Sequence, residues 1–318
     1  MRKYLLPENG NFYKANLHCH SNISDGALSV EELKAAYMEK GYSIIAYTDH
    51  NKLVSHQELN EENFLALNGY ELDVTEEKDI DWPLRKTCHI CFIALDKHNQ
   101  IEIPNGRKYT AEYINQQMKE GREKGFFVTY NHPGWSLENY EQYSQYEGMN
   151  AFEMFNYGCI VEGYNDYNSK VYDDLLYQGK RIYCIGTDDN HNHYSPDSAQ
   201  YDSFGAYVMI KSDDLEYRKI TKALENGDFY TSMGPEIKEL WFEDGKVHIE
   251  TSCADRIVLN TGRRKAAAVF AEGDNAVTTA EFTIEQNDVF FRISVFDEKG
   301  RAAHTNAYFT DDLFEFFG

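Results

Sequence analysis

Short apolar runs alternate with stretches of helical length along residues 14–226. This alternation predicts an α/β domain, in which strands and helices follow one another along the chain. We expect strands over residues 14–18, 42–47, 64–71, 89–95, 126–130, 151–155, 181–185 and 205–210. Ser29 predicts the start of a helix, because Glu32 three residues later completes a capping box, and Gly41 ends that helix. Further helices are expected over 110–124 and 162–178, each with a glycine just beyond its end.

The pattern changes after Gly234 and Pro235. Apolar runs at 246–251, 256–260, 279–284 and 289–296 are separated by turn residues, and no stretch between them predicts a helix. Asp244 and Gly245 are a hairpin signal between 240–242 and 246–249. The sequence therefore predicts two domains, an α/β domain over 1–234 and a small all-β sandwich over 235–318.

The overall charge narrows the range of partners. The chain of 318 residues carries a net charge of −22, which repels phosphate backbones and anionic bilayers. We therefore expect neither nucleic acid nor a membrane as a partner. A small anionic substrate remains compatible with this charge, because bound metal ions reverse the sign of the local field. The sequence leaves the oligomeric state open.

Residues 1–8 contain no apolar stretch of signal-peptide length, and no apolar run of membrane-spanning length follows. The six cysteines are scattered along the chain, which predicts reduced thiols and a cytoplasmic protein. Cys88 and Cys91 form a C-x-x-C without a second such pair. Two core cysteines are therefore favoured over a zinc or redox pair.

Side chains that bind metals recur where apolar runs stop. His18 and His20 are two residues apart at a strand end, so both imidazoles share one face and reach a common ion. The further candidates in chain order are Asp25, His50, Glu71, His89, His132, Asp188, Asp189 and His191. All but His89, which starts its strand, end one, and α/β barrels gather catalytic side chains at that edge.

Each candidate has a simpler interpretation. A single histidine is more often a surface or core residue than a ligand, and a carboxylate at a strand end often only caps a helix. The recurrence favours a shared metal site. The histidines that lack this context are expected at the surface or beside the site; they are His56, His98, His193, His248 and His304.

The order H-x-H, Asp, T-D-H, Glu, His, N-H-P and D-x-H resembles the PHP family, named for polymerase and histidinol phosphatase, over roughly residues 12–233. The resemblance implies a distorted (β/α)7 barrel that holds three divalent metal ions. The run 223–232 followed by a β-rich tail is similar to a PHP subgroup with a C-terminal β-sandwich. That subgroup includes a hydrolase of carbamate esters of the carbaryl type.

Carried over residue by residue, the resemblance implies three ion sites, and the ligand types suit Zn, Mn or Fe alike. His18, His20, Glu71 and Asp189 hold one ion; Glu71 bridges to a second ion, which His89 and His132 also hold; Asp25, His50 and His191 hold the third. Glu71, Asp189 and His191 are the expected catalytic residues. Asp188 remains an alternative to Asp189, and Glu153 and Asn131 are expected beside the ligands.

The expected activity is hydrolysis of a small phosphorylated metabolite by a hydroxide that bridges two metal ions. The alternative is a carbamate, ester or amide hydrolase that uses the same metals. A rival from another class is a non-catalytic protein with a structural metal site, although structural sites are closed and nine ligands over three ions leave open positions. Three cationic residues near His89 are expected to be solvated surface residues rather than substrate ligands; they are Arg85, Lys86 and Arg107.

Overall fold

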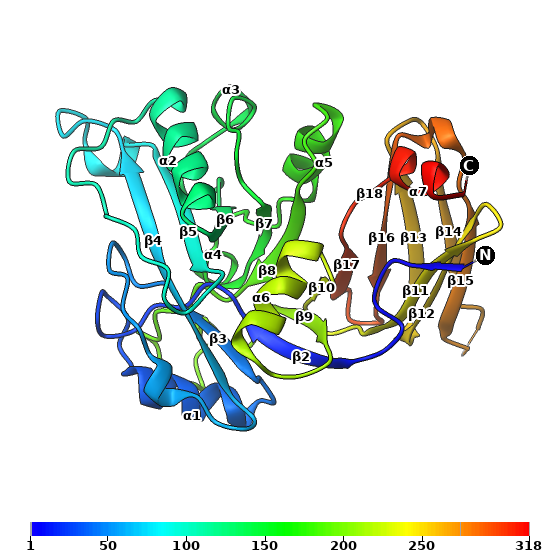
Figure 1. Ribbon diagram of the computed structural model, residues 1–318, viewed down its shortest axis with the longest axis horizontal. Helices are drawn as coiled ribbons and strands as arrows, with labels where there is room; N and C mark the ends of the chain where they lie inside the picture. The colour runs from blue at the N-terminus through cyan, green and yellow to red at the C-terminus, as the bar shows by residue number, and fades with distance from the viewer. Residues whose placement is uncertain (1, 274, 318) are drawn as a thin grey trace.

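The computed structural model describes residues 2–273 and 275–317, and its residues 11–232 combine strands and helices as an α/β region (Figure 1). The strands of this region are β2 (Asn11–Asn16), β3 (Ile44–Tyr47), β4 (Leu65–Thr75), β5 (Thr87–Ala94), β6 (Phe126–Asn131), β7 (Ala151–Asn156), β8 (Tyr183–Thr187), β9 (Tyr207–Ser212) and β10 (Phe229–Ser232). The helices are α1 (Val30–Glu39), α2 (Ala111–Glu123), α3 (Tyr140–Tyr143), α4 (Tyr157–Glu162), α5 (Ser169–Tyr177) and α6 (Tyr217–Asn226). The predicted alternation is only partial, because among the described residues no α-helix separates β3, β4 and β5 or separates β8 from β9. Ser29 caps α1 and forms the predicted capping box with Glu32, which stabilises a helix by about 1 kcal/mol.

The helix predicted over 162–178 is confirmed over 169–177, but its predicted start is wrong. Residue 162 is the last residue of a separate short helix, α4, which stops before Gly163, whose φ of 106° is left-handed. The second helix, α5, begins only at Ser169. The loop between them carries Asp166, whose carboxylate accepts hydrogen bonds from the backbone N–H groups of Gly134 and Trp135 at 2.9 and 2.7 Å. This loop therefore fixes the chain segment that follows His132.

The C-terminal region is rich in strands but is not all-β. Its strands are β11 (Ile237–Glu243), β12 (Lys246–Ala254), β13 (Arg256–Thr261), β14 (Ala266–Phe270), β15 (Val277–Thr283), β16 (Phe290–Phe296), β17 (Ala302–Thr305) and β18 (Tyr308–Phe309). The helix α7 (Thr310–Phe317) corrects the prediction that this region lacks helices. Short 3-10 turns complete the element list at Gln57–Leu59, Trp82–Leu84 and Gln286–Asp288.

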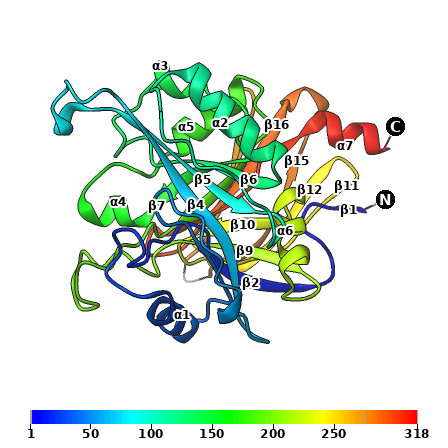
Figure 2. The same cartoon turned by 60° about the vertical axis from the view of Figure 1, so that its left-hand side comes forward.

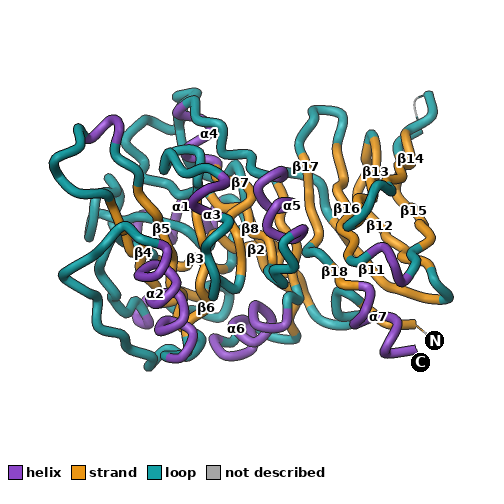
Figure 3. Tube along the Cα trace, turned by 90° about the horizontal axis from the view of Figure 1, so that it is seen from above, coloured by secondary structure: helices purple, strands orange, loops and turns teal. Residues whose placement is uncertain are grey.

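The domain division over 1–234 and 235–318 stays a prediction, and its outer bounds fall on residues outside the described ones. The structure adds that the first strand, β1 (Arg2–Tyr4), pairs with β11. Near it, Lys3 Nζ donates a hydrogen bond to the backbone oxygen of Asp312 in α7 at 2.8 Å. Both ends of the chain therefore lie against the C-terminal strands, as Figure 3 shows.

Two sheets organise the molecule. A sheet of four strands has the order β1-β11-β12-β15, and a sheet of 14 strands runs from β14 through β13, β16, β17, β10, β9, β2, β3, β4, β5, β6 and β7 to β8, with β18 paired to β16. One core cluster takes side chains from every strand between β2 and β10, so this part of the large sheet curls around a shared interior. The predicted count of seven barrel strands stays a prediction. A second core cluster lies between the four-stranded sheet and β13, β16 and β17.

Strand direction decides which side chains meet. β2, β3 and β4 are parallel, as are β6, β7 and β8, whereas β5 runs antiparallel to both β4 and β6. The start of β5 therefore lies at the same edge as the ends of the other six strands. Figure 2 shows the long β4 in front of this region. Among the described residues, no helix is long and apolar enough to cross a membrane.

Candidate metal centre

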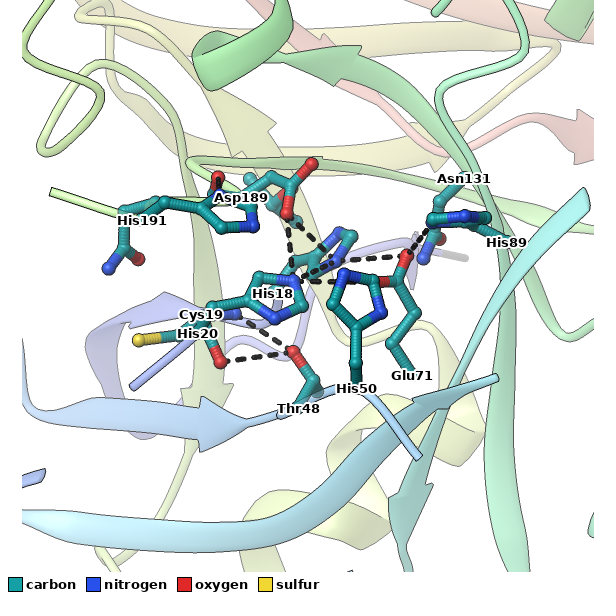
Figure 4. A network of polar contacts seen from close by, with 12 residues as sticks. His18, Cys19, His20, Thr48, His50, Glu71, His89, Asn131, Asp189 and His191 are labelled. Carbon is teal, nitrogen blue, oxygen red and sulfur yellow. Dashed lines mark hydrogen bonds and ion pairs between the residues drawn. The ribbon is translucent and has the colours of Figure 1, made fainter. Parts of the chain in front are cut away.

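The nine predicted ligand residues lie together at one edge of the curled sheet. Figure 4 labels all of them except Asp25 and His132. His18 and His20 follow β2, His50 follows β3, His132 follows β6, and Asp189 and His191 follow β8. His89 lies near the start of β5, and the reversed direction of β5 explains why this one histidine had to begin its strand. Glu71 is not at a strand end as predicted, because β4 continues to Thr75 and pairs with the start of β5.

Glu71 lies at the centre of this group, which we call the ligand cluster: His18, His20, Asp25, His50, Glu71, His89, His132, Asp189 and His191. Its side chain is 1% exposed. Five imidazoles approach its two carboxylate oxygens. The separations are 2.9 Å from His89 Nδ1, 3.1 Å from His50 Nδ1, 3.2 Å from His132 Nε2, and 3.3 Å from both His18 Nε2 and His20 Nε2. One carboxylate therefore faces ligand atoms on several sides.

Two ligand sets share His20. The first is His18, His20, Glu71 and Asp189, and the second is His20, Asp25, His50 and His191; within each set the ligand atoms lie within 4.8 Å of one another. Asp25 oxygens lie 3.6 Å from His20 Nδ1, His50 Nε2 and His191 Nε2. The Asp25 side chain is 51% exposed, so the second set faces the open side of the site.

Further ligand sets extend the cluster. His50, Glu71 and His89 form one, and His18, His132 and Glu153 form another, again with atoms within 4.8 Å. His132 and His89 both approach Glu71 Oε1, at 3.2 and 2.9 Å. The cluster can therefore hold metal ions, with Glu71 between neighbouring sets.

The structure separates the two neighbouring aspartates. Asp189 Oδ1 lies 3.0 Å from both His18 Nε2 and His20 Nε2. Asp188 lies elsewhere: its oxygens accept from the Tyr37 hydroxyl at 2.8 Å and from the backbone N–H groups of 204, 205 and 206 at 2.8 to 2.9 Å. Because its oxygens already accept four hydrogen bonds, Asp188 is not oriented to bind an ion. The arrangement therefore favours Asp189 as the ligand.

Glu153 orients His18 from behind. It is fully buried, and its Oε1 accepts from His18 Nδ1 at 2.8 Å and from Thr187 Oγ1 at 2.5 Å. Its Oε2 accepts from the backbone N–H of His132 at 3.1 Å. The bond to Nδ1 leaves His18 Nε2 free to face Glu71 and Asp189, which is the usual task of a carboxylate behind a metal-binding histidine.

Asn131 lies next to the cluster, but its side chain forms hydrogen bonds with residues outside the cluster. Its side chain contacts Cys91 Sγ at 3.0 Å and accepts from Thr129 Oγ1 at 2.8 Å. Cys88 and Cys91 are free thiols buried in the core, as predicted.

The charges of the cluster balance one another. Burial disfavours the ionised form of Glu71, but the surrounding histidines outweigh burial and hold its pKa well below the usual range. Burial also opposes protonation of His20 and His132, yet Asp189 and Glu71 raise their pKa values to about 10 and about 9. For His50 burial prevails and lowers the pKa to about 4. Protons and metal ions therefore compete for the same nitrogen atoms.

Several buried atoms of the cluster form no hydrogen bond with the described residues, although charged groups lie 3.0 to 3.6 Å from them. They are His20 Nδ1, His50 Nδ1 and Asp189 Oδ1. A buried polar atom without a hydrogen bond costs about 1–3 kcal/mol, and bound cations would satisfy these atoms. The backbone is unusual here as well, because His132 and Asp189 have positive φ values of 24° and 49°. Such strain concentrates at functional sites, and the donor set fits divalent transition metals.

A cavity of about 380 Å³ opens onto the cluster. Beyond the ligands, its walls contain His193, which was expected at the surface or beside the site. They also contain residues that sequence reasoning missed: Asp73, Thr75, Trp82, Trp135, Gly158, Cys159, Glu162 and Asp202. Only Trp135 carried a sequence signal, because it follows the N-H-P-G segment around His132. Gly158 lies so close to the backbone oxygens of Asp188 and Asp189 that a Cβ there would approach them to 2.8 and 2.9 Å.

The cationic residues and histidines that were expected outside the ligand cluster lie only partly where they were expected. Arg107 pairs with Asp73 at 3.0 Å and Arg85 bonds the backbone oxygen of Ile80, and neither they nor Lys86 lines the cavity. His98 and His193 are exposed as expected, and His248 is half-buried. His56 and His304 are instead buried, at 4% and 3% exposure.

An α/β fold with a buried cluster of histidines and carboxylates at one strand edge defines a protein built to hold metal ions. Residues 16–178, about half of the chain, match the family model described as the PHP domain. The chain belongs to the PHP domain family.

Individual relatives are more distant. The DNA polymerase/3'-5' exonuclease PolX of Bacillus subtilis is 33% identical over 109 residues, and the match covers 29% of this chain and 19% of that protein. This chain thus spans about a fifth of the length of that relative.

Solved structures give weaker likenesses. A two-domain protein containing a predicted PHP-like metal-dependent phosphoesterase from Bacteroides vulgatus has a TM-score of 0.47 at 15% identity, covering 96% of this chain and 98% of that one. A proposed metal-dependent phosphoesterase from Bifidobacterium adolescentis has a TM-score of 0.41 at 13% identity, covering 61% and 91%. Scores this low support no inference about function.

Proposed function

We propose that this protein is a metal-dependent phosphoesterase that hydrolyses a small phosphorylated metabolite. The observation that carries the proposal is the position of Glu71 between ligand sets, with a further set around Asp25 on the open side of the cavity. Divalent ions bound there would supply an activated water as the nucleophile and neutralise charge on the phosphoryl and leaving oxygens. A set of three ions, of Zn, Mn or Fe, is part of the proposal.

The protein's own residues prepare the site for this chemistry. Glu71 and Asp189 hold His18 and His20 in place through contacts of 3.0 to 3.3 Å. Glu153 fixes the ring orientation of His18 from the opposite side. Asp25 and His191 border the cavity with partly exposed side chains, so a substrate reaches the cluster from that side.

Hydrolysis of a carbamate, ester or amide is the second candidate. One observation favours it: none of the lysine or arginine side chains that the structure describes lines the cavity. A phosphoryl group would therefore depend on metal ions for all its positive partners, whereas a carbonyl needs fewer of them.

A substrate panel on Mn-, Zn- and Fe-loaded protein separates the two activities. The proposal expects phosphate release from small phosphomonoesters and two to three transition-metal ions per chain by elemental analysis. Hydrolysis of aryl carbamates or esters without any phosphate release would replace the first function by the second. A metal content below one ion per chain, unrecovered by added Mn or Zn, would refute both.

His50→Ala tests the Asp25 side of the cluster within the same panel. Phosphomonoesters are the slowest uncatalysed substrates, so they depend most on neutralisation of the leaving oxygen. The variant should lose more phosphomonoester turnover than turnover of an activated aryl ester. Equal losses with two ions retained would show that both reactions use that set.

We also propose the partners, the location and the domain division of this protein. The net charge of −22 supports a small-molecule substrate over nucleic acid or a membrane surface. A cytoplasmic location and the domain division near residue 234 belong to the same proposal.

A further inference from the structure

Two tryptophans form part of the cavity wall beyond the ligands. Trp135 lies beside the cluster, with its ring centroid 5.2 Å from that of His89 and 5.4 Å from that of His132. The N–H bonds to Asp166 hold its backbone in place. Trp82 sits in the connection between β4 and β5 and lines the same cavity although it is 60% exposed. A large exposed aromatic side chain at a cavity is commonly a binding surface.

The same connection provides a comparison. Leu84 lies two residues from Trp82 and is 69% exposed, but it does not line the cavity. General exposure of this loop therefore does not account for the position of Trp82 at the cavity.

The charge of the wall is negative beyond the ligand cluster. Asp73, Glu162 and Asp202 line the cavity, and no lysine or arginine among the described residues does so. Asp73 is paired with Arg107 at 3.0 Å, and Asp202 accepts from the backbone N–H of His191 at 2.7 Å. The side chain of Glu162, exposed at the end of α4, makes no hydrogen bond or close ion pair with the described residues, and His191 and His193 attract it only over a longer distance. It is therefore the carboxylate left to interact with a ligand.

We propose that the substrate is a phosphate monoester of a single uncharged ring, held against Trp82, and that Glu162 disfavours a second anionic group on that ring. The inference rests on the proposed function for its scissile group. Aromatic faces bind the flat or C–H faces of uncharged rings, and a carboxylate opposite a like charge selects against it. A ring with two phosphates would find no lysine or arginine side chain among the described residues of this wall for the second one.

A matched substrate pair tests the charge preference. Phenyl phosphate and 4-carboxyphenyl phosphate differ by one carboxylate on the ring. Wild type should prefer phenyl phosphate about tenfold in kcat/KM, and Glu162→Gln should reduce that preference about fivefold, as expected for one charge near a surface. Glu236→Gln, an exposed carboxylate of the C-terminal region, is the control and should leave the preference unchanged.

Matched variants test the ring contact. Trp82→Ala should raise KM for phenyl phosphate about tenfold and change kcat less, since a stacked ring contributes about 1 kcal/mol or more. Leu84→Ala should behave as wild type. Binding without turnover gives a second readout: phenylphosphonate should quench tryptophan emission of metal-loaded wild type and Leu84→Ala more strongly than that of Trp82→Ala.

The outcomes distinguish the two proposals. Phosphatase activity with equal rates on both substrates, or with Trp82→Ala equal to Leu84→Ala, overturns this inference and leaves the proposed function standing. Absence of phosphatase activity overturns the proposed function, and phenyl acetate and 4-carboxyphenyl acetate then replace the pair. With these two acetates, a tenfold preference for phenyl acetate that depends on Glu162 would support the proposed selection of an uncharged ring. Equal rates on the two acetates would overturn it.

Discussion

Two regions of this molecule bury charged side chains but give them different partners. In the ligand cluster, several buried ligand atoms lack a hydrogen-bond partner among the described residues. The second region, which we call the joint, connects α5 and the loop before it to β16 and β17 and comprises Tyr167, Asp173, Arg292, Ser294 and His304. There Arg292 forms a two-armed ion pair with Asp173 at 2.8 and 2.9 Å.

Every member of the joint has a protein partner. Arg292 also donates to Ser294 Oγ at 3.2 Å, Ser294 Oγ contacts His304 Nδ1 at 2.8 Å, and His304 Nε2 contacts the Tyr167 hydroxyl at 2.8 Å. In the joint, the protein itself supplies every hydrogen-bond and ion-pair partner, whereas the cluster needs bound ions as partners. Buried charges with protein partners contribute to stability, and buried charges without them are available to bind ions.

The largest effect is expected at the centre of the cluster. Glu71→Gln removes the charge that five imidazoles approach, so hydrolysis should fall on the order of 10³-fold with any metal, together with metal content. Glu153→Gln alters only the residue behind His18 and should cost about 10–100-fold. Kinetics and elemental analysis on the same preparations check both values. Near wild-type turnover in Glu71→Gln would remove Glu71 from its central role.

Asp188 and Asp189 allow the same comparison, between a group with protein partners and a proposed ligand, at adjacent residues. Asp189→Asn weakens a ligand and should lower activity about 10²-fold. Asp188→Asn places an amide against backbone N–H groups in a buried site, so it should cost about 1–3 kcal/mol of unfolding free energy. Its activity per folded molecule should stay within a few-fold of wild type. Denaturant unfolding and kinetics measure the two quantities, and the opposite ranking would make Asp188 the ligand.

The cluster could be predicted from the sequence because its signal is local. Most of the ligands lie near or just beyond a strand end, and H-x-H spacing places two imidazoles on one strand face. Glu71, within β4, and Asp25, in the loop after β2, are the exceptions. The sequence could not show that β5 is reversed, which is the reason that His89 begins its strand. Strand direction is set by pairing with distant residues rather than by the local pattern.

The joint could not be predicted, because nothing near His304 in the sequence identifies its partners. Tyr167 is 137 residues away from it, and His304 was expected at the surface or beside the site. The predicted start of the 162–178 helix was wrong because Gly163 alone is a weak signal for the end of the preceding helix. Trp82 lies in a loop whose position over the cavity depends on the β4–β5 pairing, so only the structure connects it with the site.

Breaking the joint should affect stability without affecting chemistry. Asp173→Asn leaves Arg292, whose side chain is 5% exposed, without its counter-charge, and the loss should be about 3 kcal/mol of unfolding free energy. Glu123→Gln is the control, because Glu123 in α2 pairs with Lys119 and both side chains are more than half exposed, so it should cost less than about 1 kcal/mol. Urea unfolding measures both, and turnover per folded molecule should be unchanged. Equal costs would show that the buried pair is no more important than a surface pair.

The smallest effect concerns the charge state of His304. Arg292 can only donate to Ser294 Oγ, so the Ser294 hydroxyl proton is directed to His304 Nδ1, and His304 Nε2 carries the ring proton toward Tyr167. A second proton on Nδ1 would oppose this arrangement. Burial, together with the charge of Arg292, lowers the pKa of His304 to about 3.

Because the pKa of His304 is lower in the folded protein than in the unfolded chain, stability decreases as the pH decreases. Between the unfolded value of about 6.5 and the folded value, the unfolded chain binds a proton that the folded chain does not. The stabilisation is therefore complete above pH 6.5 and is lost progressively as pH falls toward 3. From pH 7 to pH 5.5 the loss should be about 1 kcal/mol of unfolding free energy. His304→Gln keeps a polar side chain without this titration, so its unfolding free energy should decrease less over that interval, with all other groups common to both proteins. Parallel pH profiles for wild type and variant would mean that His304 is protonated equally in both states and that the joint tolerates its charge.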